Sequence, residues 1–313
     1  MKKDDDIVIV RSLKEDLHLE QITGDEKALE REITLADTNR PGLELAGYFD
    51  FSQSKRILIL GDKEIAYIKT MNEKQQDKSF DFITHETTPA IIISKSHRCP
   101  DKLMEIADKK NFPILISANL TTRVIVDVVS YLDEALADYQ CLHGGLLNIY
   151  GKGVLIKGES GVGKSEIALD LIKRGHQLIA DDRVDCYRIH NRIVAESPEL
   201  LRGMLEIRGI GIINVSRMFG ASSVLDKGNI DFVVSLEKWD SSQDYDRVGI
   251  EDKKYENIMD VDIPKICLPV REGRSMAAII ESAVTNFALT QKGMDSAKEF
   301  EQRVLDYIEK NKK

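Results

Sequence analysis

The feature that most constrains this chain is a glycine-rich octapeptide in its second half. It matches the phosphate-loop pattern G-x-x-x-x-G-K-[ST] at every fixed position, with the sequence Gly158-Glu159-Ser160-Gly161-Val162-Gly163-Lys164-Ser165. In such a loop the glycines let successive backbone N–H groups point into one concavity, the lysine contacts the outer phosphates, and the serine hydroxyl binds Mg²⁺. The sequence therefore predicts a phosphate site at residues 158–165.

The residues on either side of the loop have the pattern that a phosphate loop requires. Val154–Ile156 is a short apolar run that predicts a strand, and Glu166–Arg174 carries apolar residues at helical spacing. Gly175 can end that helix in a left-handed conformation. The loop would then deliver its phosphates to the amino end of a helix, where unpaired N–H groups and the helix dipole favour an anion.

Composition indicates a globular chain with one large domain or two ordinary ones. The 313 residues are 42% hydrophobic and 31% charged, and the net charge of −9 disfavours nucleic acid as a partner. The amino terminus lacks the apolar core of a signal peptide, and no run approaches the roughly 18 apolar residues of a membrane span. We therefore expect a cytoplasmic protein. The four cysteines are far apart and predict neither a disulfide framework nor a zinc site.

The first half of the chain, residues 1–135, alternates between short apolar runs and helical segments. Strands are expected at 56–60, 90–93 and 113–116, and helices at 62–71 and 101–110. This order predicts an α/β domain with a parallel or mixed sheet and no catalytic residues. The apolar helical stripe at 122–137 is expected to join it to a second domain, residues 136–313.

The second domain opens with a predicted β-hairpin, residues 146–157, that leads directly into the phosphate loop. His143 precedes the hairpin, and by itself it fits a structural role as well as a catalytic one. Asp181 and Asp182 follow the next predicted strand. One acid could help to hold Mg²⁺ while its neighbour accepts the proton of an attacking hydroxyl, and the pattern does not assign the two roles.

Three later segments complete the candidate site. Residues 205–214 have the apolar alternation of a strand, in which Glu206 is a candidate Mg²⁺ ligand and Arg208 a candidate phosphate contact. Residues 219–228 are expected to form a mobile loop. Arg247 could stabilise transition-state charge, although a lone arginine is more often a surface residue.

These motifs resemble those of one family, the bifunctional HPr kinase/phosphorylase of bacteria. The resemblance spans nearly the whole chain. It rests on His143-Gly144, the phosphate loop, Arg174-Gly175-His176, Ala180-Asp181-Asp182, Pro198-Glu199-Leu200, residues 205–214, Tyr245-Asp246-Arg247 and Pro269-Val270-Arg271. It implies an N-terminal α/β domain that is not catalytic. It also implies a C-terminal P-loop kinase domain of the phosphoenolpyruvate-carboxykinase-like type with a mixed sheet.

The same resemblance implies an activity. Enzymes of this family phosphorylate a serine of the phosphocarrier protein HPr with ATP or pyrophosphate, and so regulate carbon catabolite repression. They also reverse the reaction, since inorganic phosphate attacks the phosphoserine and pyrophosphate leaves. The family forms homohexamers. The expected partners are therefore HPr and other copies of this chain.

By position, the resemblance also implies roles for individual residues. His143, Lys164, Asp182 and Arg247 correspond to catalytic positions, with Asp182 as proton acceptor in phosphorylation and proton donor in the reverse. Ser165 and Glu206 correspond to Mg²⁺ ligands. The segment tied to both activities is Leu205, Glu206, Ile207, Arg208, Gly209, Ile210, Gly211, Ile212, Ile213 and Asn214. The segment tied to dephosphorylation is Leu268, Pro269, Val270, Arg271, Glu272 and Gly273.

The chain departs from the family pattern P-V-R-P-G-R at one position, where Glu272 replaces proline. The change frees a fixed φ and adds negative charge where phosphate would pass, so we hypothesise a weaker reverse reaction. Two other functions stay open at the level of the residues. One is a P-loop kinase of a small metabolite, and the other is a nucleotide-dependent switch or assembly protein. Phosphoryl transfer to a protein would separate them.

Overall fold

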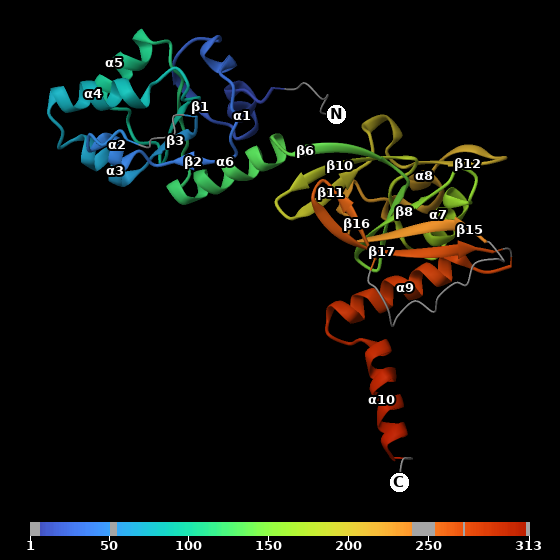
Figure 1. Cartoon of the computed structure of the whole chain (residues 1–313). Helices are drawn as coiled ribbons and strands as arrows, with labels where there is room; N and C mark the ends of the chain where they lie inside the picture. Colours follow the sequence, from blue (N-terminus) through green and yellow to red (C-terminus); the bar gives the residue numbers. More distant parts are fainter. Residues whose placement is uncertain (1–6, 51–54, 240–253, 272, 311–313) are drawn as a thin grey trace. The chain divides into compact units, whose positions relative to one another are not determined.

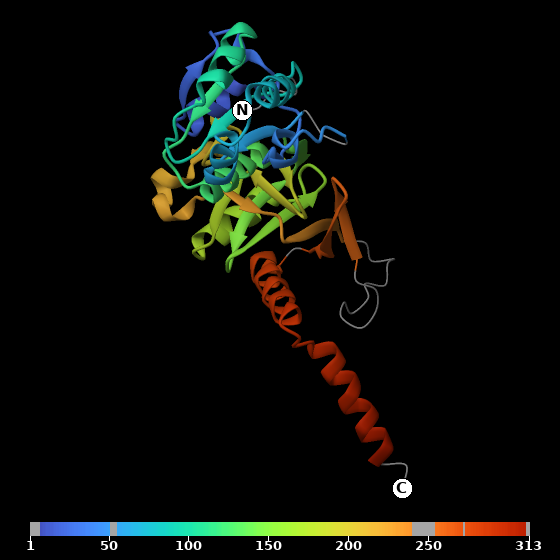
Figure 2. The same ribbon diagram turned by 90° about the vertical axis from the view of Figure 1, so that its left-hand side faces the viewer.

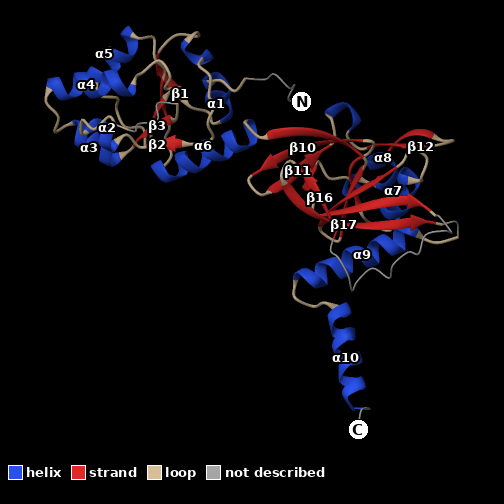
Figure 3. Cartoon of the chain, viewed as in Figure 1, coloured by secondary structure: helices blue, strands red, loops and turns tan. Residues whose placement is uncertain are grey.

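The chain forms two compact units, Lys2–Ala137 and Asp138–Lys313 (Figure 1). The structure is a computed structural model and describes residues 7–50, 55–239, 254–271 and 273–310. Two of the predicted site residues, Arg247 and Glu272, lie outside these ranges. Helices and strands alternate in the first unit, whereas strands predominate in the second (Figure 3).

The amino-terminal unit is built on a five-stranded sheet with the order β1-β5-β4-β3-β2. Its elements are α1 (Val10–Asp16), β1 (Glu20–Thr23), η1 (Ala28–Glu30), β2 (Thr38–Asn39), α2 (Gly42–Leu45), β3 (Ile57–Leu60), α3 (Asp62–Ile68), α4 (Glu73–Ile83), β4 (Ile91–Ile93), α5 (Asp101–Lys109), β5 (Ile114–Ile116) and α6 (Thr121–Ala135). The predicted strands and helices of this half are all present. Strands β2 to β5 are parallel and β1 is antiparallel to β5, so the sheet is mixed.

Both faces of this sheet are buried, which explains why its strands are continuous apolar runs. Leu58 and Leu60 of β3 pack in a core with residues of α3, α4 and α5. Ile57 and Ile59 of the same strand pack in a second core with residues of α1 and α6. A strand covered by helices on both sides has no solvent face that would call for polar residues.

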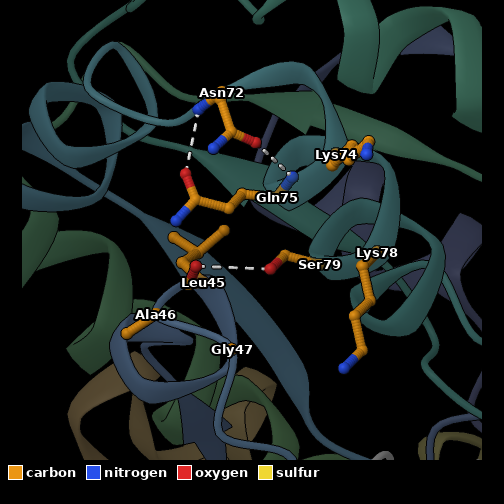
Figure 4. Close-up of a pocket in the computed structure, with 8 residues that line it drawn as sticks. All are labelled: Leu45, Ala46, Gly47, Asn72, Lys74, Gln75, Lys78 and Ser79. Carbon is orange, nitrogen blue, oxygen red and sulfur yellow. Dashed lines mark hydrogen bonds between the residues drawn. The ribbon is translucent and has the colours of Figure 1, made fainter.

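A hollow of about 320 Å³ lies on this unit where α2 meets α4 (Figure 4). Its hydrogen bonds serve the structure of the unit. Asn72 caps α4 by accepting from the backbone N–H of Gln75 at 3.0 Å, and the Gln75 side chain accepts in return from the Asn72 N–H at 2.9 Å. The hydroxyl of Ser79 donates to the carbonyl of Leu45 at 3.2 Å. The first two bonds cap α4, and the third joins α4 to α2.

The carboxyl-terminal unit contains a six-stranded sheet of order β16-β17-β15-β8-β7-β9, a four-stranded sheet of order β14-β11-β10-β6, and the hairpin β12-β13. Its strands are β6 (Asp138–His143), β7 (Gly145–Ile149), β8 (Lys152–Gly158), β9 (Gln177–Ala180), β10 (Arg183–Ile189), β11 (Arg192–Glu196), β12 (Met204–Ile207), β13 (Gly211–Asn214), β14 (Lys227–Asn229), β15 (Phe232–Lys238), β16 (Lys254–Ile258) and β17 (Val261–Val270). Its helices are α7 (Lys164–Lys173), η2 (Glu199–Leu201), α8 (Val215–Phe219), η3 (Ala221–Ser223), α9 (Met276–Gln291) and α10 (Ser296–Lys310). The prediction of a mobile loop at 219–228 is wrong, because this segment contains η3 and part of β14.

The six-stranded sheet is mixed and carries the phosphate loop at its centre. β8, β15 and β17 run parallel, whereas β7, β9 and β16 pair antiparallel with their neighbours. One face of this sheet packs against α7 and α9, and Figures 1 and 2 both show α9 alongside the strands. The other face packs against the four-stranded sheet. The α/β fold class with a mixed sheet in this domain is confirmed.

The predicted hairpin before the phosphate loop is confirmed as β7 and β8. Ile149 pairs with Lys152, so the turn consists of two residues, Tyr150 and Gly151. Both have positive φ, +52° and +80°, as a type I′ turn requires.

Gly153, near the start of β8, lies close to a neighbouring backbone segment. A Cβ built on Gly153 would lie 1.6 Å from the carbonyl oxygen of Asn229. Only glycine lets these two backbone segments approach so closely.

Glu256 of β16 links two other strands of the same sheet. Its carboxylate accepts hydrogen bonds from Lys157 of β8 and, at 2.8 Å, from Lys265 of β17. The bonds from Lys157 and Lys265 hold the pKa of Glu256 below its usual range.

The two last helices differ in how they are held. Ser275 caps α9 by accepting from the Ala278 N–H at 3.4 Å, and α9 contributes Ile280 and Val284 to the core. In contrast, no residue of α10 is buried. Within the part of the chain that the structure describes, no helix has the length and apolarity needed to cross a membrane.

Candidate active site

The phosphate loop connects β8 to α7 and has the backbone that its glycines predict. Gly161 and Gly163 have φ of +82° and +99°, values that most side chains disfavour. A Cβ on Gly158 would lie 2.8 Å from the carbonyl oxygen of Leu236 in β15, so this position is restricted by space as well. The loop leads into the first turn of α7, where the helix dipole and free N–H groups favour an anion.

Lys164 is the first residue of α7, and its side chain folds back over the loop. Its ammonium group donates to the carbonyl oxygen of Gly158 at 2.8 Å and to that of Glu159 at 3.2 Å. These bonds hold a positive charge across the loop that the glycines form. Ser165 is the next residue and is partly exposed at the same helix end. The arrangement is suited to binding phosphate groups.

The structure brings His143 and Asp182 together, although 39 positions separate them in the chain. Nδ1 of His143 lies 3.1 Å from Oδ1 of Asp182, and the two side chains are 60% and 71% exposed. The pairing of β6 with β10 causes this contact, because Arg183 at the start of β10 stands opposite His143 at the end of β6. Asp182 has a left-handed backbone with φ of +63°. The site therefore presents a carboxylate with an imidazole partner to solvent.

The neighbouring acid, Asp181, lies in a different environment. It is only 9% exposed, and burial raises the pKa of its carboxyl group. Its Oδ2 accepts a hydrogen bond from the backbone N–H of Glu206 at 3.2 Å. Thus Asp181 fastens the β12-β13 hairpin, while Asp182 faces solvent. The residue pattern by itself does not distinguish these two acids, because their difference comes from burial.

Residues 205–214 form this hairpin and not the single strand that their alternation suggests. Leu205 pairs with Ile213, and the chain reverses between Ile207 and Gly211. Gly209 and Gly211 have positive φ, and the reversal depends on such backbone freedom. Within this segment Leu205 and Ile207 are buried, Ile213 and Asn214 are half-buried, and Glu206, Arg208, Ile210 and Ile212 are exposed.

The hairpin also touches the phosphate loop. A Cβ built on Gly161 would lie 3.2 Å from Nη1 of Arg208, so the guanidinium group lies directly against the loop. The predicted phosphate contact from Arg208 is compatible with this position. Glu206 lies two residues earlier, with its side chain in solvent and its backbone held by Asp181. One hairpin therefore links the phosphate loop to Asp181.

The described residues of the segment 268–273 reach the same edge of the six-stranded sheet. The last residues of β17 are Leu268, Pro269 and Val270. Strand β17 pairs in parallel with β15, and β15 pairs in parallel with β8. Arg271 then lies over the ring of Trp239, with its guanidinium carbon 5.0 Å from the ring centroid. Gly273 has φ of +81°. Sequence reasoning missed Trp239, although its position directly after a strand parallel to β8 could have indicated it.

The donors predicted for a metal ion fit Mg²⁺. Ser165 offers a hydroxyl and Glu206 a solvent-facing carboxylate, and Mg²⁺ prefers such oxygen ligands. Within the described residues, no three histidine, cysteine, aspartate or glutamate side chains gather into a metal-binding group. Mg²⁺ at nucleotide sites is commonly held by one or two protein oxygens together with substrate phosphates and water. These two residues suit a site of that kind.

Comparison with known proteins agrees with this organisation. Two family models match in succession, HPr Serine kinase N terminus over residues 8–132 and HPr Serine kinase C-terminal domain over residues 134–304. The HPr kinase/phosphorylase of Lactobacillus johnsonii is 43% identical, and the match covers 98% of this chain and 96% of that protein. The HPr kinase/phosphorylase of Bacillus pumilus is 41% identical, with 97% and 98% covered.

Among solved structures, the Hpr(Ser) kinase/phosphatase from Coxiella burnetii matches with 36% sequence identity and a TM-score of 0.47. The match covers 51% of this chain and 98% of that one. The two family models together span nearly all of the present sequence, and the curated relatives align over almost their full length. The chain therefore belongs to the HPr kinase/phosphorylase family.

Proposed function

We propose that this chain is an enzyme that phosphorylates a serine of the phosphocarrier protein HPr and removes the same phosphate by phosphorolysis. The phosphoryl donor is ATP or pyrophosphate, and inorganic phosphate is the co-substrate of the reverse reaction. Family membership supports the reaction and the substrate. The structural observation that best supports it is the contact between solvent-facing Asp182 and His143, next to a hairpin that touches the phosphate loop.

In the forward direction the serine hydroxyl of HPr attacks the phosphorus atom that is transferred. Lys164 neutralises charge on the phosphoryl oxygens, and Asp182 accepts the proton of the hydroxyl. His143 orients the Asp182 carboxylate through their 3.1 Å contact. Arg247, which lies outside the described residues, is assigned to transition-state charge by its family position.

In the reverse direction an oxygen of inorganic phosphate forms a bond to the phosphorus of phosphoserine while the bond from phosphorus to the serine oxygen breaks. Asp182 returns its proton to that oxygen, and pyrophosphate leaves. This is the microscopic reverse of phosphorylation by pyrophosphate, so the same residues serve both directions. When bound by Ser165 and Glu206, Mg²⁺ neutralises phosphate charge.

The proposal assigns the chemistry to a domain of residues 136–313 and leaves residues 1–135 without a catalytic role. All described residues of the proposed site belong to the Asp138–Lys313 unit. We further propose that the enzyme acts in the cytoplasm as a homohexamer and regulates carbon catabolite repression. These last points rest on the resemblance to the family.

The test is to incubate the purified chain with HPr and Mg-ATP, and to follow the mass of HPr. We expect HPr to gain one phosphoryl group. Addition of inorganic phosphate should then remove it and release pyrophosphate, measured by a coupled assay. An HPr variant whose target serine is replaced by alanine should gain nothing.

The control on the enzyme side is Lys164→Met, with Lys173→Met at the other end of α7 as the matched variant. The first should lose phosphorylation and the second should retain it, because only Lys164 folds over the loop. If HPr gains no mass while ATP still binds or is slowly hydrolysed, the proposal is wrong and a nucleotide-dependent switch becomes the better interpretation.

A further inference from the structure

The acid proposed as proton acceptor lies in an unfavourable backbone conformation. The N–H of Arg183 donates to the carbonyl oxygen of Asp181 at 2.7 Å, so Asp182 is the central residue of a three-residue turn. With φ of +63° at Asp182, this turn has the form that is rare and strained in proteins. Such a conformation persists only where the surrounding structure holds it firmly. The residues that hold this turn therefore determine where the Asp182 carboxylate lies.

Two contacts hold the first half of the turn. Asp181 is buried, and its carboxylate accepts from the backbone N–H of Glu206 at 3.2 Å. The N–H of Gly144, the residue directly after β6, donates to the carbonyl oxygen of Asp182 at 3.1 Å. The second half of the turn is Arg183, which needs an anchor of its own.

Three side chains from the neighbouring strands β6 and β10 (Figure 1) supply that anchor. Asp185 is only 4% exposed, and its Oδ1 accepts from Nε of Arg183 and from the hydroxyl of Tyr139, each at 2.9 Å. Nη2 of Arg183 donates to the same hydroxyl at 2.9 Å, which closes a ring of three hydrogen bonds. Burial and the hydrogen bond to Asp185 raise the pKa of Tyr139, so the hydroxyl keeps the proton that it donates.

The ring lies on the same face of the two strands as His143. Residues two apart in a strand share a face, which places Tyr139 with His143 on β6 and Arg183 with Asp185 on β10. Arg183 stands directly opposite His143 in this pairing. A buried carboxylate is costly unless a charged partner and further hydrogen bonds satisfy it. The burial of Asp185 therefore favours one position of Arg183, next to the contact between His143 and Asp182.

We propose that Asp185 is a positioning residue for the proton acceptor, because with Tyr139 it fixes Arg183 and so holds the strained turn that places Asp182. The inference rests on the proposed function, in which Asp182 takes the proton of the serine hydroxyl. Asp185 acts through Arg183 and takes no proton in the reaction. A positioned proton acceptor contributes about 10²- to 10⁴-fold, and a displaced one loses part of that factor.

The kinetic test compares Asp185→Ala with Asp185→Asn in the phosphorylation of HPr. Alanine removes the acceptor of two hydrogen bonds, so kcat should fall about tenfold while KM for ATP and for HPr changes less than about twofold. Asparagine retains an oxygen acceptor and should recover part of that loss. Tyr139→Phe leaves Asp185 paired with Arg183 and should lower kcat only about threefold, as expected for the loss of one hydroxyl.

The amino-terminal unit offers a matched control for the loss of a buried carboxylate. Glu64 is 6% exposed, and its Oε2 accepts from Nη2 of Arg40 at 2.7 Å. Glu64→Ala therefore also removes a buried acid that an arginine binds. It should leave kcat and both KM values as in the unchanged protein, because the described residues of the proposed site belong to the other unit.

Combining Asp185→Ala with Asp182→Asn separates positioning from a general loss of structure. Asp185→Ala should slow single-turnover phosphorylation in the otherwise unchanged protein. It should not slow Asp182→Asn any further, because no proton acceptor is then left to position. Losses that multiply would mean that Asp185→Ala distorts the whole site, and they would overturn the inference.

An unchanged kcat in Asp185→Ala, beside a slow Asp182→Asn, would overturn this inference and leave the proposed function intact. Glu64→Ala as slow as Asp185→Ala would overturn it as well. If Asp185→Ala does not fold, as loss of ATP binding would show, Tyr139→Phe decides, and an unchanged kcat in that variant counts against the inference. Failure of the unchanged protein to phosphorylate HPr would refute the proposed function, and this inference with it.

Discussion

The contact between His143 and Asp182 predicts that these side chains act as one catalytic unit. Both are largely exposed, and an exposed ion pair is worth about 0–1 kcal/mol. Loss of the contact alone would therefore slow phosphorylation by no more than about fivefold. A positioned proton acceptor contributes about 10²- to 10⁴-fold. We expect kcat to fall by that larger amount in Asp182→Asn, and by at least about tenfold in His143→Ala if the imidazole orients the acceptor.

A double-mutant cycle measures whether the two residues depend on each other. Single-turnover phosphorylation of HPr is followed by mass in the two single variants and in the double variant, at saturating ATP. The double variant should be no slower than Asp182→Asn, because without the acceptor His143 has nothing to orient. Losses that multiply would refute the reasoning, since they would mean that the residues act independently.

The amino-terminal unit supplies a matched control for this cycle. His97 and Asp62 form a comparable histidine–aspartate contact there, with Nε2 of His97 2.7 Å from Oδ1 of Asp62 and the side chains 32% and 56% exposed. The corresponding variants, His97→Ala and Asp62→Asn, should leave kcat unchanged. Urea unfolding should show all variants within about 1 kcal/mol of the unchanged protein, as expected for exposed pairs.

Three further predictions concern stability and reactivity. Glu256→Gln removes a carboxylate whose pKa two lysines lower, so it should destabilise the protein at neutral pH. Because that stability is present above the ordinary pKa and is lost as pH falls through the lowered one, the difference in unfolding free energy should vanish in acid. Gly153→Ala places a Cβ 1.6 Å from the Asn229 carbonyl oxygen and should cost about 3 kcal/mol or more in urea unfolding, because backbone must move. Cys141 is exposed, whereas burial raises the pKa of Cys186 to about 12. A thiol reagent at mild alkaline pH should thus label Cys141 first and Cys186 only after unfolding, as timed mass spectrometry would show.

Sequence patterns predict the surroundings of the phosphate loop well, because these depend on residues close together in the chain. The β7-β8 hairpin is predicted by two apolar runs joined by a glycine-rich turn, and the structure places that turn at Tyr150 and Gly151. The helix α7 is predicted by apolar residues at helical spacing and a glycine after its end. Each of these signals lies within a single element and its turn.

The geometry between elements is not predictable in the same way. His143 meets Asp182 only through the register of β6 and β10, and the alternation of β6 is too weak to indicate a strand. The reversal at Gly209 is hidden inside an apolar run, so the segment 205–214 is mistaken for one strand. Arg271 reaches Trp239 only through the parallel pairing of β15 with β17. Register depends on tertiary packing, which a local pattern does not contain.

The left-handed backbone of Asp182 limits which residues an enzyme of this kind could accept there. Its φ of +63° suits aspartate, asparagine or glycine better than residues with longer or branched side chains. Glutamate would retain the carboxylate but strain the main chain, and glycine would retain the main chain but lose the proton acceptor. No single replacement keeps both the left-handed backbone and the proton acceptor. We therefore expect few substitutions of Asp182 to be tolerated, in natural sequences or in directed evolution, even where residues of the surrounding surface can vary.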